Sequence, residues 1–218
     1  GEMIAAGYPI KAIYALDSWD APDTEIEVNR VEAFELEKMS LLQTPNQVVA
    51  VAKIPSKTDA VNLTGKLTIV LDGIQDPGNL GTIIRIADWF GVQQIVASED
   101  TVDVYNPKVI QATMGSITRV KVNYVNLNDY ISQSSLPVFG TFMDGKNLYK
   151  EVLPKEAILI FGNEANGISA SLEKNIKNRI AIPRFPSEDG NTSCGDIQKT
   201  ESLNVATATS IILSEFKR

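Results

Sequence analysis

Three short stretches of the chain combine polar side chains with glycine at spacings that suit a binding site. In the first, Asn79, Gly81 and Arg85 have N-x-G-x-x-x-R spacing after an apolar run. The second, residues 162–169, reads G-x-E-x-x-G-x-S, and the third, residues 202–205, reads S-L-N-V. Each stretch is attached to its own apolar strand. This pattern predicts a cation, a carboxylate and amides near strand ends, where α/β proteins bind ligands.

Taken alone, each polar residue also has a purely structural explanation. Arg85 lies outside the apolar stripe of its expected helix, where an arginine is usually only solvated. Glu164 can be a charge near the N-terminus of a helix beginning about Ser169, where acids are favoured. Ser202 can be a helix cap, whereas Asn204 falls in a first turn whose exposed amides favour an anionic or carbonyl group. Single residues therefore leave both interpretations open.

The residue types that are missing exclude several kinds of chemistry. The chain has no histidine and one cysteine, Cys194. It therefore cannot use an imidazole base, a Ser-His-Asp triad or a histidine-bound metal, and one thiol cannot form a zinc cluster or an internal disulfide. We expect no metal and an incidental thiol. Proton transfer is left to Asp, Glu, Lys, Tyr, Cys or an arginine-assisted water.

A strand, a glycine turn and a helix can also bind the pyrophosphate of a dinucleotide. Gly73, Gly78 and Gly81 do not have G-x-G-x-x-G spacing, and the chain contains no G-x-x-x-x-G-K-[ST]. Both the Rossmann fingerprint and the phosphate-binding P-loop are therefore missing. The sequence disfavours a dinucleotide site.

The elements that must position these motifs alternate between strands and helices from Lys66 onward. Continuous runs of Val, Ile and Leu are typical of a parallel sheet covered on both faces, so the expected fold class is α/β. One helix is expected at residues 79–90, ended by Gly91. The predicted strands are residues 67–71, 94–97, 120–124, 138–142, 157–161 and 179–182.

The first 56 residues have a different pattern. Residues 10–16 and 48–54 are expected strands beside a short helix-like piece. We therefore predict a small, incomplete α/β domain at residues 1–56, a linker at 57–65 and the main domain at 66–218. The chain begins at Gly1 inside what reads as a helix, which suggests a longer gene product.

Charge and composition indicate an ordinary globular protein of 218 residues that is 44% hydrophobic. No apolar run approaches the roughly 18 residues of a membrane span, and no signal sequence opens the chain, so we expect a cytoplasmic protein without a membrane partner. A net charge of -7 favours selective over promiscuous RNA binding. A local cationic patch could form from Arg85, Lys108, Arg119, Lys121, Arg184 and Lys199.

Together, the three motifs resemble those of the SpoU family, also called the TrmH family, of the SPOUT methyltransferase superfamily. The resemblance covers residues 66–218, and the order and strand attachment of the motifs agree. More weakly, residues 44–51 (TPNQVVAV) are similar to the end of a ribosomal-protein-like RNA-binding domain that often precedes this fold. The matching positions are Asn79, Gly81 and Arg85; Gly162, Glu164, Gly167 and Ser169; and Pro183 with Ser202 to Val205.

This resemblance implies a homodimeric 2′-O-ribose methyltransferase that binds S-adenosylmethionine in a deep trefoil knot at the C-terminus. Arg85 is the implied catalytic residue. A guanidinium holds its proton tightly, so we expect it to stabilise a developing alkoxide or a phosphate rather than act as a base. The residues expected to orient it are Asn79, Glu164, Ser202 and Asn204. The implied cofactor-binding residues are Thr141, Gly162, Ile182, Leu203 and Asn204.

The implied substrate is ribosomal or transfer RNA, and the N-terminal remnant favours ribosomal RNA of the large subunit. The rival outside enzymes is a non-catalytic RNA-binding or ribosome-assembly protein, which the intact polar motif residues disfavour. The chain departs from the family pattern at residues 184–201, a polar loop that is longer than usual. We expect this loop to be a flexible rim that orders on binding RNA or cofactor.

Overall fold

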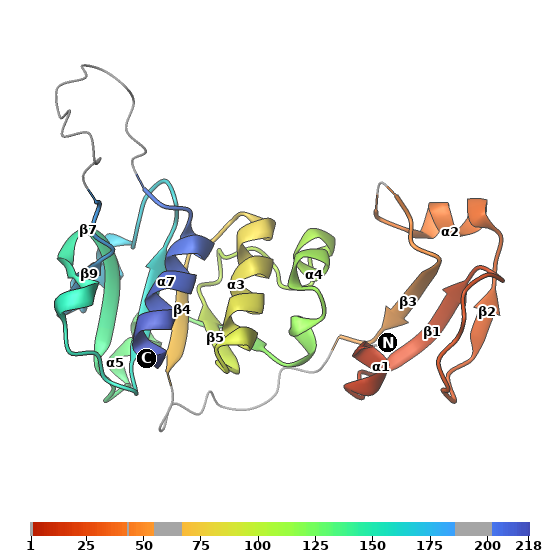
Figure 1. Cartoon of the computed structure of the whole chain (residues 1–218), viewed down its shortest axis with the longest axis horizontal. Coiled ribbons are helices and arrows are strands. Elements are labelled where there is room, and N and C mark those ends of the chain that lie inside the picture. Colours follow the sequence, from red (N-terminus) through yellow and green to blue (C-terminus); the bar gives the residue numbers. More distant parts are fainter. Residues whose placement is uncertain (1, 43, 55–66, 186–201) are drawn as a thin grey trace, which may run out of the picture. The chain divides into compact units, whose positions relative to one another are not determined.

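The computed structural model describes residues 2–42, 44–54, 67–185 and 202–218 (Figure 1). The chain divides into two compact units, Gly1–Ala60 and Val61–Arg218. The predicted linker at residues 57–65 lies outside the described residues. Within the described part of the chain, no helix is both long enough and apolar enough to cross a bilayer.

The N-terminal unit is a small sheet with a short helix. Strand β1 (Ile10–Ala15) pairs in parallel with β2 (Val28–Arg30) and antiparallel with β3 (Val48–Ala52). Helix α1 (Glu2–Ala5) opens the unit, and a reciprocal capping box of two glutamates starts α2 (Ala33–Met39). The structure thus has the two predicted strands, whereas the three-residue β2 was too short to be predicted.

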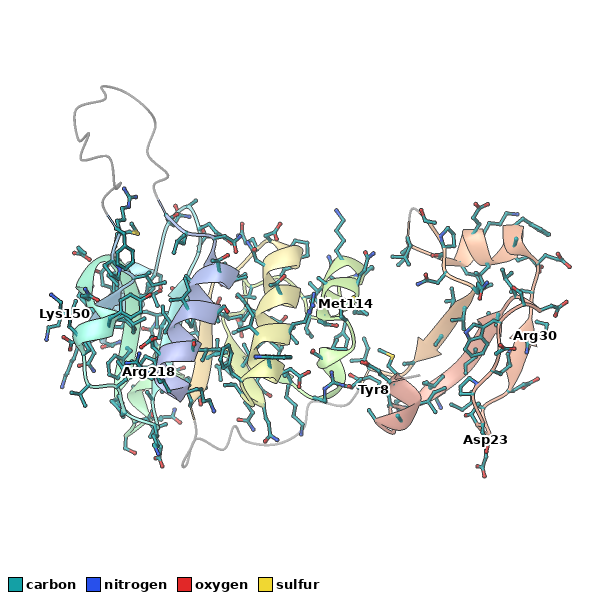
Figure 2. All side chains as sticks on the ribbon, viewed as in Figure 1. Tyr8, Asp23, Arg30, Met114, Lys150 and Arg218 are labelled. Atoms are coloured by element: carbon teal, nitrogen blue, oxygen red, sulfur yellow. The ribbon has the colours of Figure 1, made fainter. Side chains whose placement is uncertain are left out.

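The core of this unit is thin. Its fully buried apolar side chains are Ile13, Ala15 and Leu36, whereas Phe34 and Leu41 are exposed. Arg30 (Figure 2) closes the bend after β1, because its Nη1 donates to the carbonyl oxygens of Leu16 at 2.7 Å and Trp19 at 2.9 Å.

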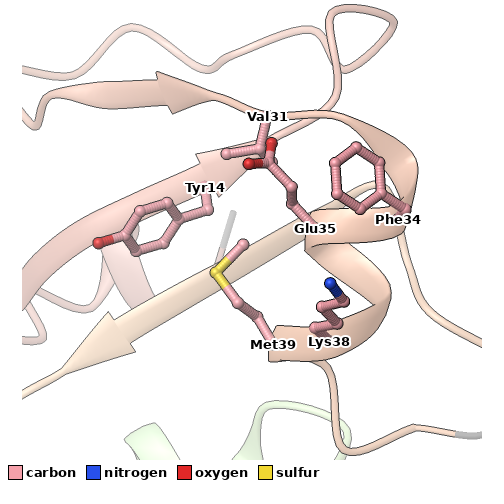
Figure 3. A pocket seen from close by; sticks show the side chains of 6 residues that line it. All are labelled: Tyr14, Val31, Phe34, Glu35, Lys38 and Met39. Atoms are coloured by element: carbon pink, nitrogen blue, oxygen red, sulfur yellow. The ribbon is translucent and has the colours of Figure 1, made fainter.

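A cavity of about 400 Å³ lies between α2 and β1 (Figure 3). The Lys38 ammonium is 5.4 Å from the centroid of the Phe34 ring. The cavity therefore combines an apolar floor with one cation and one carboxylate. Its lining residues are Tyr14, Val31, Phe34, Glu35, Lys38 and Met39.

The second unit is built on a six-stranded sheet with the order β6-β5-β4-β8-β7-β9, and every neighbouring pair is parallel. The predicted parallel α/β sheet is therefore confirmed. Strand β7 is longer than predicted, because its pairing with β9 continues beyond an irregularity. The strands are β4 (Thr68–Asp72), β5 (Gln94–Ala97), β6 (Lys121–Tyr124), β7 (Val138–Asn147), β8 (Ile158–Gly162) and β9 (Asn178–Ala181).

Helices cover both faces of this sheet. Helix α3 (Pro77–Trp89) lies between α4 (Pro107–Thr113) and α7 (Val205–Lys217) (Figure 1). The rings of Phe139 in β7 and Phe216 in α7 pack edge to face at 5.3 Å. On the opposite face, a buried apolar cluster joins the sheet to α5 (Leu127–Ser132) and to the segment around α6 (Ala170–Glu173). The 3-10 turns η1 (Ser116–Thr118) and η2 (Leu148–Lys150) complete the unit.

Helix α3 begins two residues earlier than predicted. The carboxylate of Asp76 accepts a hydrogen bond from the backbone N–H of Asn79 at 2.7 Å, and Pro77 fits the first turn without a donor. At the other end, Gly91 has a φ of +67°, the left-handed conformation expected of a glycine after a helix.

Gly81 lies inside α3, within the helix predicted at residues 79–90. A Cβ atom there would come within 2.5 Å of the Cβ of Ala112, so the missing side chain allows α3 and α4 to pack closely.

The predicted knot depends on the path of the chain between β9 and α7. Residues 186–201, which form most of the long polar loop and include Cys194 and Lys199, lie outside the described residues. The described part shows β9 at one edge of the sheet and α7 packed against α3 and β8.

Candidate active site

The first two polar motifs follow neighbouring strands at the point where the sheet changes direction. Strands β5 and β6 lie on one side of β4. On the other side, β8 pairs with β4, and β7 lies beyond β8. Such a switch point leaves a crevice at the carboxyl ends of parallel strands, where ligands bind in this class of fold. The loops at residues 73–76 and 163–169 start at this edge.

A chain of hydrogen bonds joins the three motifs. The Asn79 Nδ2 donates to Glu164 Oε1, and the Asn204 Nδ2 donates to Asn79 Oδ1 at 2.8 Å. One amide therefore binds a carboxylate with its donor end and a second amide with its acceptor end. Glu164 and Asn204 are exposed, and Asn79 is half-buried. The structure thus brings together three of the predicted site residues, from positions 85 and 125 residues apart in the chain.

Asn204 is held in place by the helix that it caps. Its Oδ1 accepts hydrogen bonds from the backbone N–H groups of Ala206 at 3.0 Å and Thr207 at 3.3 Å. The helix begins at Val205, so Asn204 is the N-cap residue and does not lie in the first turn as predicted. The exposed Ser202 precedes the cap and does not serve as one. The cap fixes Asn204 with its Nδ2 directed at Asn79.

Glu164 is held by a tight loop rather than by a helix. Asn163 and Gly167 exchange backbone hydrogen bonds at 3.0 and 2.8 Å, and Asn163 Nδ2 donates to the carbonyl of Gly73 at 2.8 Å. Glu164 therefore lies in a turn, and helix α6 begins only at Ala170. Its explanation as a charge at a helix N-terminus is wrong.

The glycines of the second motif are required by this loop. A Cβ atom on Gly162 would collide with the backbone of Gly167, and Gly167 itself has a φ of +68°. The backbone N–H of Ser169 donates to Asp72 Oδ2 at 2.7 Å, which ties the end of the loop to the end of β4. The two strand ends are therefore locked together beside the polar chain.

Arg85 lies apart from this chain of hydrogen bonds. Its side chain is exposed and makes no hydrogen bond or ion pair with the residues that the structure describes. Six residues of helix separate it from Asn79 by about 9 Å along the axis and about 120° around it. It lies one turn beyond Gly81, on the side of α3 that adjoins α4.

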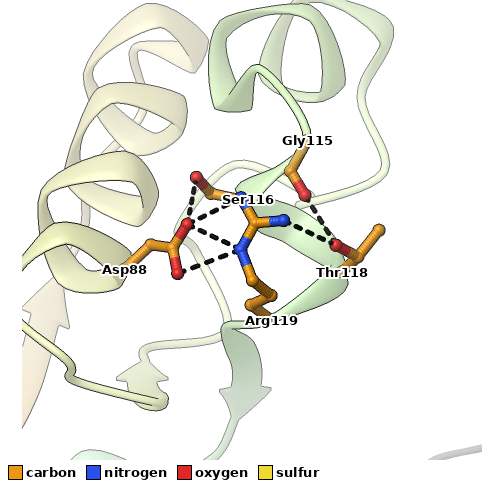
Figure 4. A network of polar contacts seen from close by, with 5 residues as sticks. All are labelled: Asp88, Gly115, Ser116, Thr118 and Arg119. Atoms are coloured by element: carbon orange, nitrogen blue, oxygen red, sulfur yellow. Dashed lines mark hydrogen bonds and ion pairs between the residues drawn. The ribbon is translucent and has the colours of Figure 1, made fainter. Parts of the chain in front are cut away.

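Near the far end of α3, Asp88 forms a second polar network (Figure 4). Arg119 Nη2 lies 2.8 Å and Nε lies 2.9 Å from Asp88 Oδ2, and the Ser116 hydroxyl donates to the same oxygen at 2.8 Å. These donors, the Arg119 guanidinium first, lower the pKa of Asp88 below its ordinary value, and partial burial opposes them. Arg119 was expected in a cationic patch, and the ion pair now neutralises its charge.

Three of the five predicted cofactor-binding residues lie in or directly after the neighbouring strands β8, β7 and β9. Gly162 ends β8, Ile182 follows the end of β9, and Thr141 lies in β7 between them, where its hydroxyl donates to the carbonyl of Ile160 at 3.2 Å. Leu203, directly before Asn204, is 47% exposed. An exposed leucine and a half-buried isoleucine leave apolar surface near strand ends, which suits a flat aromatic ring.

Sequence reasoning missed an arginine that shapes this edge. Thr141 and Lys146 both align with Ile180, so residues 142–145 bulge out of the ladder between β7 and β9. Arg179 donates at 2.6 Å to both Asp144 and Glu173, and its guanidinium lies 3.5 Å from the centroid of the Phe142 ring. Because Arg179 sits inside a predicted strand with no motif around it, the sequence carried no signal of this role.

A cavity of about 260 Å³ at the carboxyl ends of β4, β5 and β6 was also missed. Its lining comes from separate loops, so no spacing in the sequence could have revealed it. In the described part of the chain, no group of three or more His, Cys, Asp or Glu side chains is placed to hold a metal ion. The polar lining residues are Asp72, Ser98, Glu99, Asp100, Asn126, Asn128, Ser169 and Ser171.

The parallel sheet, with polar motifs at its switch point, defines an α/β protein that matches solved SPOUT methyltransferases. The chain belongs to the SpoU rRNA methylase family, whose model matches residues 66–214.

Three similar proteins extend this result. Over 211 residues the chain is 29% identical to the 23S rRNA (guanosine(2553)-2'-O)-methyltransferase RlmP of Bacillus subtilis, covering 94% of this chain and 79% of that protein. A TrmH-family protein from Porphyromonas gingivalis has a structure with a TM-score of 0.82 at 36% identity, covering 99% of this chain and 85% of that one. The methyltransferase AviRb of Streptomyces viridochromogenes, solved with AdoMet, has a TM-score of 0.80 at 22% identity, covering 99% and 85%, and shows likeness of fold.

Proposed function

We propose that this protein transfers a methyl group from S-adenosylmethionine to the 2′-hydroxyl of a ribose in ribosomal RNA. The observation that carries the proposal is the Asn79 amide, which joins Glu164 to Asn204 and so assembles the three family motifs. Family membership supports the methyl transfer. The likeness to an enzyme named for 2′-O-methylation of 23S rRNA favours ribosomal over transfer RNA.

The residues at the edge formed by β7, β8 and β9 fit the proposed cofactor. Gly162 ends β8, where its missing side chain admits the backbone of Gly167, and Leu203 and Ile182 offer apolar surface to an adenine ring. Thr141 lies directly before the bulge that Arg179 holds. When bound, the sulfonium cofactor supplies an already activated methyl group.

In this proposal the polar side chains position the ribose and stabilise its charge. As the 2′-hydroxyl gives its proton to water, negative charge develops on the 2′-oxygen, and the Arg85 guanidinium stabilises that alkoxide or an adjacent phosphate. The hydrogen-bonded side chains of Glu164, Asn79 and Asn204 fix the reacting groups relative to each other, which lowers the entropic part of the barrier. Ser202, two residues before Asn204, is proposed to contact substrate or cofactor.

The proposal also includes parts that lie around the site. These are a trefoil knot formed between β9 and α7, a homodimer, and an RNA-binding role for residues 1–56. Likeness to the Porphyromonas gingivalis structure over 99% of the chain supports an arrangement shared with that protein. The single cysteine favours a reducing, cytoplasmic location. No resident metal is proposed.

The test uses the protein with methyl-labelled S-adenosylmethionine and separate pools of unmodified ribosomal and transfer RNA. Digestion of the RNA then identifies the labelled nucleoside. We expect a 2′-O-methylnucleoside from the ribosomal pool. Label on a base would refute ribose methylation, and label only in the transfer RNA would refute the substrate class. If the cofactor binds and neither pool is labelled, the non-catalytic assembly protein becomes the better account.

A further inference from the structure

Arg85 and Asp88 are neighbours on the surface of α3, yet they are not paired. Residues three apart on a helix face each other closely enough to form an ion pair. The structure instead gives the Asp88 carboxylate to Arg119 and Ser116 (Figure 4). Arg85 has no ion pair among the described residues. Two arginines thus compete for one carboxylate, and the one outside the helix holds it.

The geometry explains why Arg119 holds the carboxylate. Its backbone N–H donates to the carbonyl of Ser116 at 3.0 Å, so the turn η1 holds Arg119 and Ser116 next to each other. Arg119 Nε also lies 3.1 Å from Asp88 Oδ1, which spreads the contact over both oxygens. The Asp88 side chain is 24% exposed. The Arg119 side chain, which begins in a turn, loses less freedom on pairing with Asp88 than the Arg85 side chain, which projects into solvent.

We propose that Arg119 is a positioning residue that occupies Asp88 and thereby keeps the Arg85 guanidinium available to the RNA. This inference rests on the proposed function, in which Arg85 stabilises the alkoxide or an adjacent phosphate. A carboxylate accepts about four hydrogen bonds, and Arg119 with Ser116 fills most of them. Asp88 is left with little capacity to draw Arg85 along the helix surface.

The test compares four proteins by the single-turnover rate of methyl transfer to ribosomal RNA at saturating cofactor. In Arg119→Ala, Asp88 is free to bind Arg85, and we expect a rate about fivefold lower, the scale of a partly exposed ion pair. In Asp88→Ala the competitor is gone, so the rate stays within about twofold of wild type. The double variant Asp88→Ala/Arg119→Ala is expected to recover the rate of Asp88→Ala.

This rescue separates positioning from simple bracing of α3. If Arg119 only braced the helix, both single variants would lose the same ion pair, and the double variant would be as slow as either. That result would overturn the inference. Melting temperatures of the four proteins show whether the single variants are equally destabilised, so a loss of folding cannot imitate a difference in rate. Arg119→Lys, which keeps the charge beside Asp88, is expected to retain most of the wild-type rate.

Two reference measurements distinguish failure of this inference from failure of the proposed function. A wild-type protein that labels no ribose would remove the proposed function itself. An Arg85→Ala variant as fast as wild type would remove the role of Arg85 and the inference with it. Arg218→Ala, which breaks a surface ion pair to Glu215 at 3.3 Å, is the control for loss of an arginine and should match wild type.

Discussion

Helix α3 carries a polar network near each end, and the two are built from different chemistry. Near its start, the neutral amide of Asn79 links the exposed carboxylate of Glu164 to the exposed amide of Asn204. Near its end, Asp88 is fixed by a charged fork and a hydroxyl. The first network joins three motifs that are distant in the chain, whereas the second joins α3 to the turn η1 next to α4.

This difference separates a candidate catalytic site, around Asn79, from a structural support, around Asp88. Hydrogen bonds between side chains that water can reach add little to folding, because water offers the same hydrogen bonds. The assembly of the first network from three motifs therefore indicates a task other than stability. The second network is a partly buried ion pair that joins the end of α3 to η1. The first network belongs to the proposed catalytic site. The second fixes the end of α3 and, in the proposal above, keeps Asp88 away from Arg85.

The largest expected effect is on Arg85. Arg85→Ala removes the cation proposed to stabilise the transition state, and removal of one such donor typically slows an enzyme about 100-fold to 1,000-fold. We expect the methyl-transfer rate to fall by this amount while the melting temperature stays near wild type, since the side chain has no partner among the described residues. Single-turnover kinetics and thermal unfolding measure both. A rate within a few-fold of wild type would show that Arg85 does not stabilise the transition state.

The next effect concerns the packing of α3 against α4 at Gly81. In Gly81→Ala the new Cβ would meet Ala112 and the carbonyl of Val109, and overpacking of this kind costs about 1–3 kcal/mol. We expect the free energy of unfolding, measured with denaturant, to fall by that amount. Gly78→Ala on the same helix is the control, because its nearest atom is Asp76 Oδ1 at 3.1 Å. Equal effects in the two variants would contradict close packing of α3 on α4.

The smallest effect is the pH dependence of the stability that the ion pair between Asp88 and Arg119 contributes. The Arg119 guanidinium holds the pKa of Asp88 below its ordinary value of 3.8. A carboxyl group whose folded pKa is lowered stabilises the protein above the ordinary value, and this contribution is lost as pH falls through the folded pKa. The stability advantage of wild type over Asp88→Asn should therefore shrink below about pH 4. An advantage that is constant between about pH 6 and 3 would show that the pair does not stabilise the fold.

The sequence predicted the parallel sheet well, because buried parallel strands appear in a sequence as continuous apolar runs. Residues 94–97 were predicted as a strand and form β5 with those bounds. The start of α3 was missed by two residues, since the cap at Asp76 was not recognised. Strand β7 was cut short at Phe142, because polar residues in its bulge do not read as strand.

The candidate site was predicted as a set of residues but not as a geometry. Motif spacing identified Asn79, Glu164 and Asn204, yet no spacing could show that one amide would bridge the other two. The roles of Arg119 and Arg179 depend on partners 31 and 35 residues away in the chain, which a single sequence does not connect. Contacts that form only in the folded state were the part beyond prediction.

The most direct test of the account places Asn79→Ala beside Asp88→Ala, two changes on one helix, and measures the methyl-transfer rate and melting temperature of each. The account predicts a rate about 10-fold to 100-fold lower for Asn79→Ala with an almost unchanged melting temperature. For Asp88→Ala it predicts a lower melting temperature with a rate within about twofold of wild type. A wild-type rate for Asn79→Ala, or equal loss of rate in both variants, would contradict the assignment of catalysis to the first network.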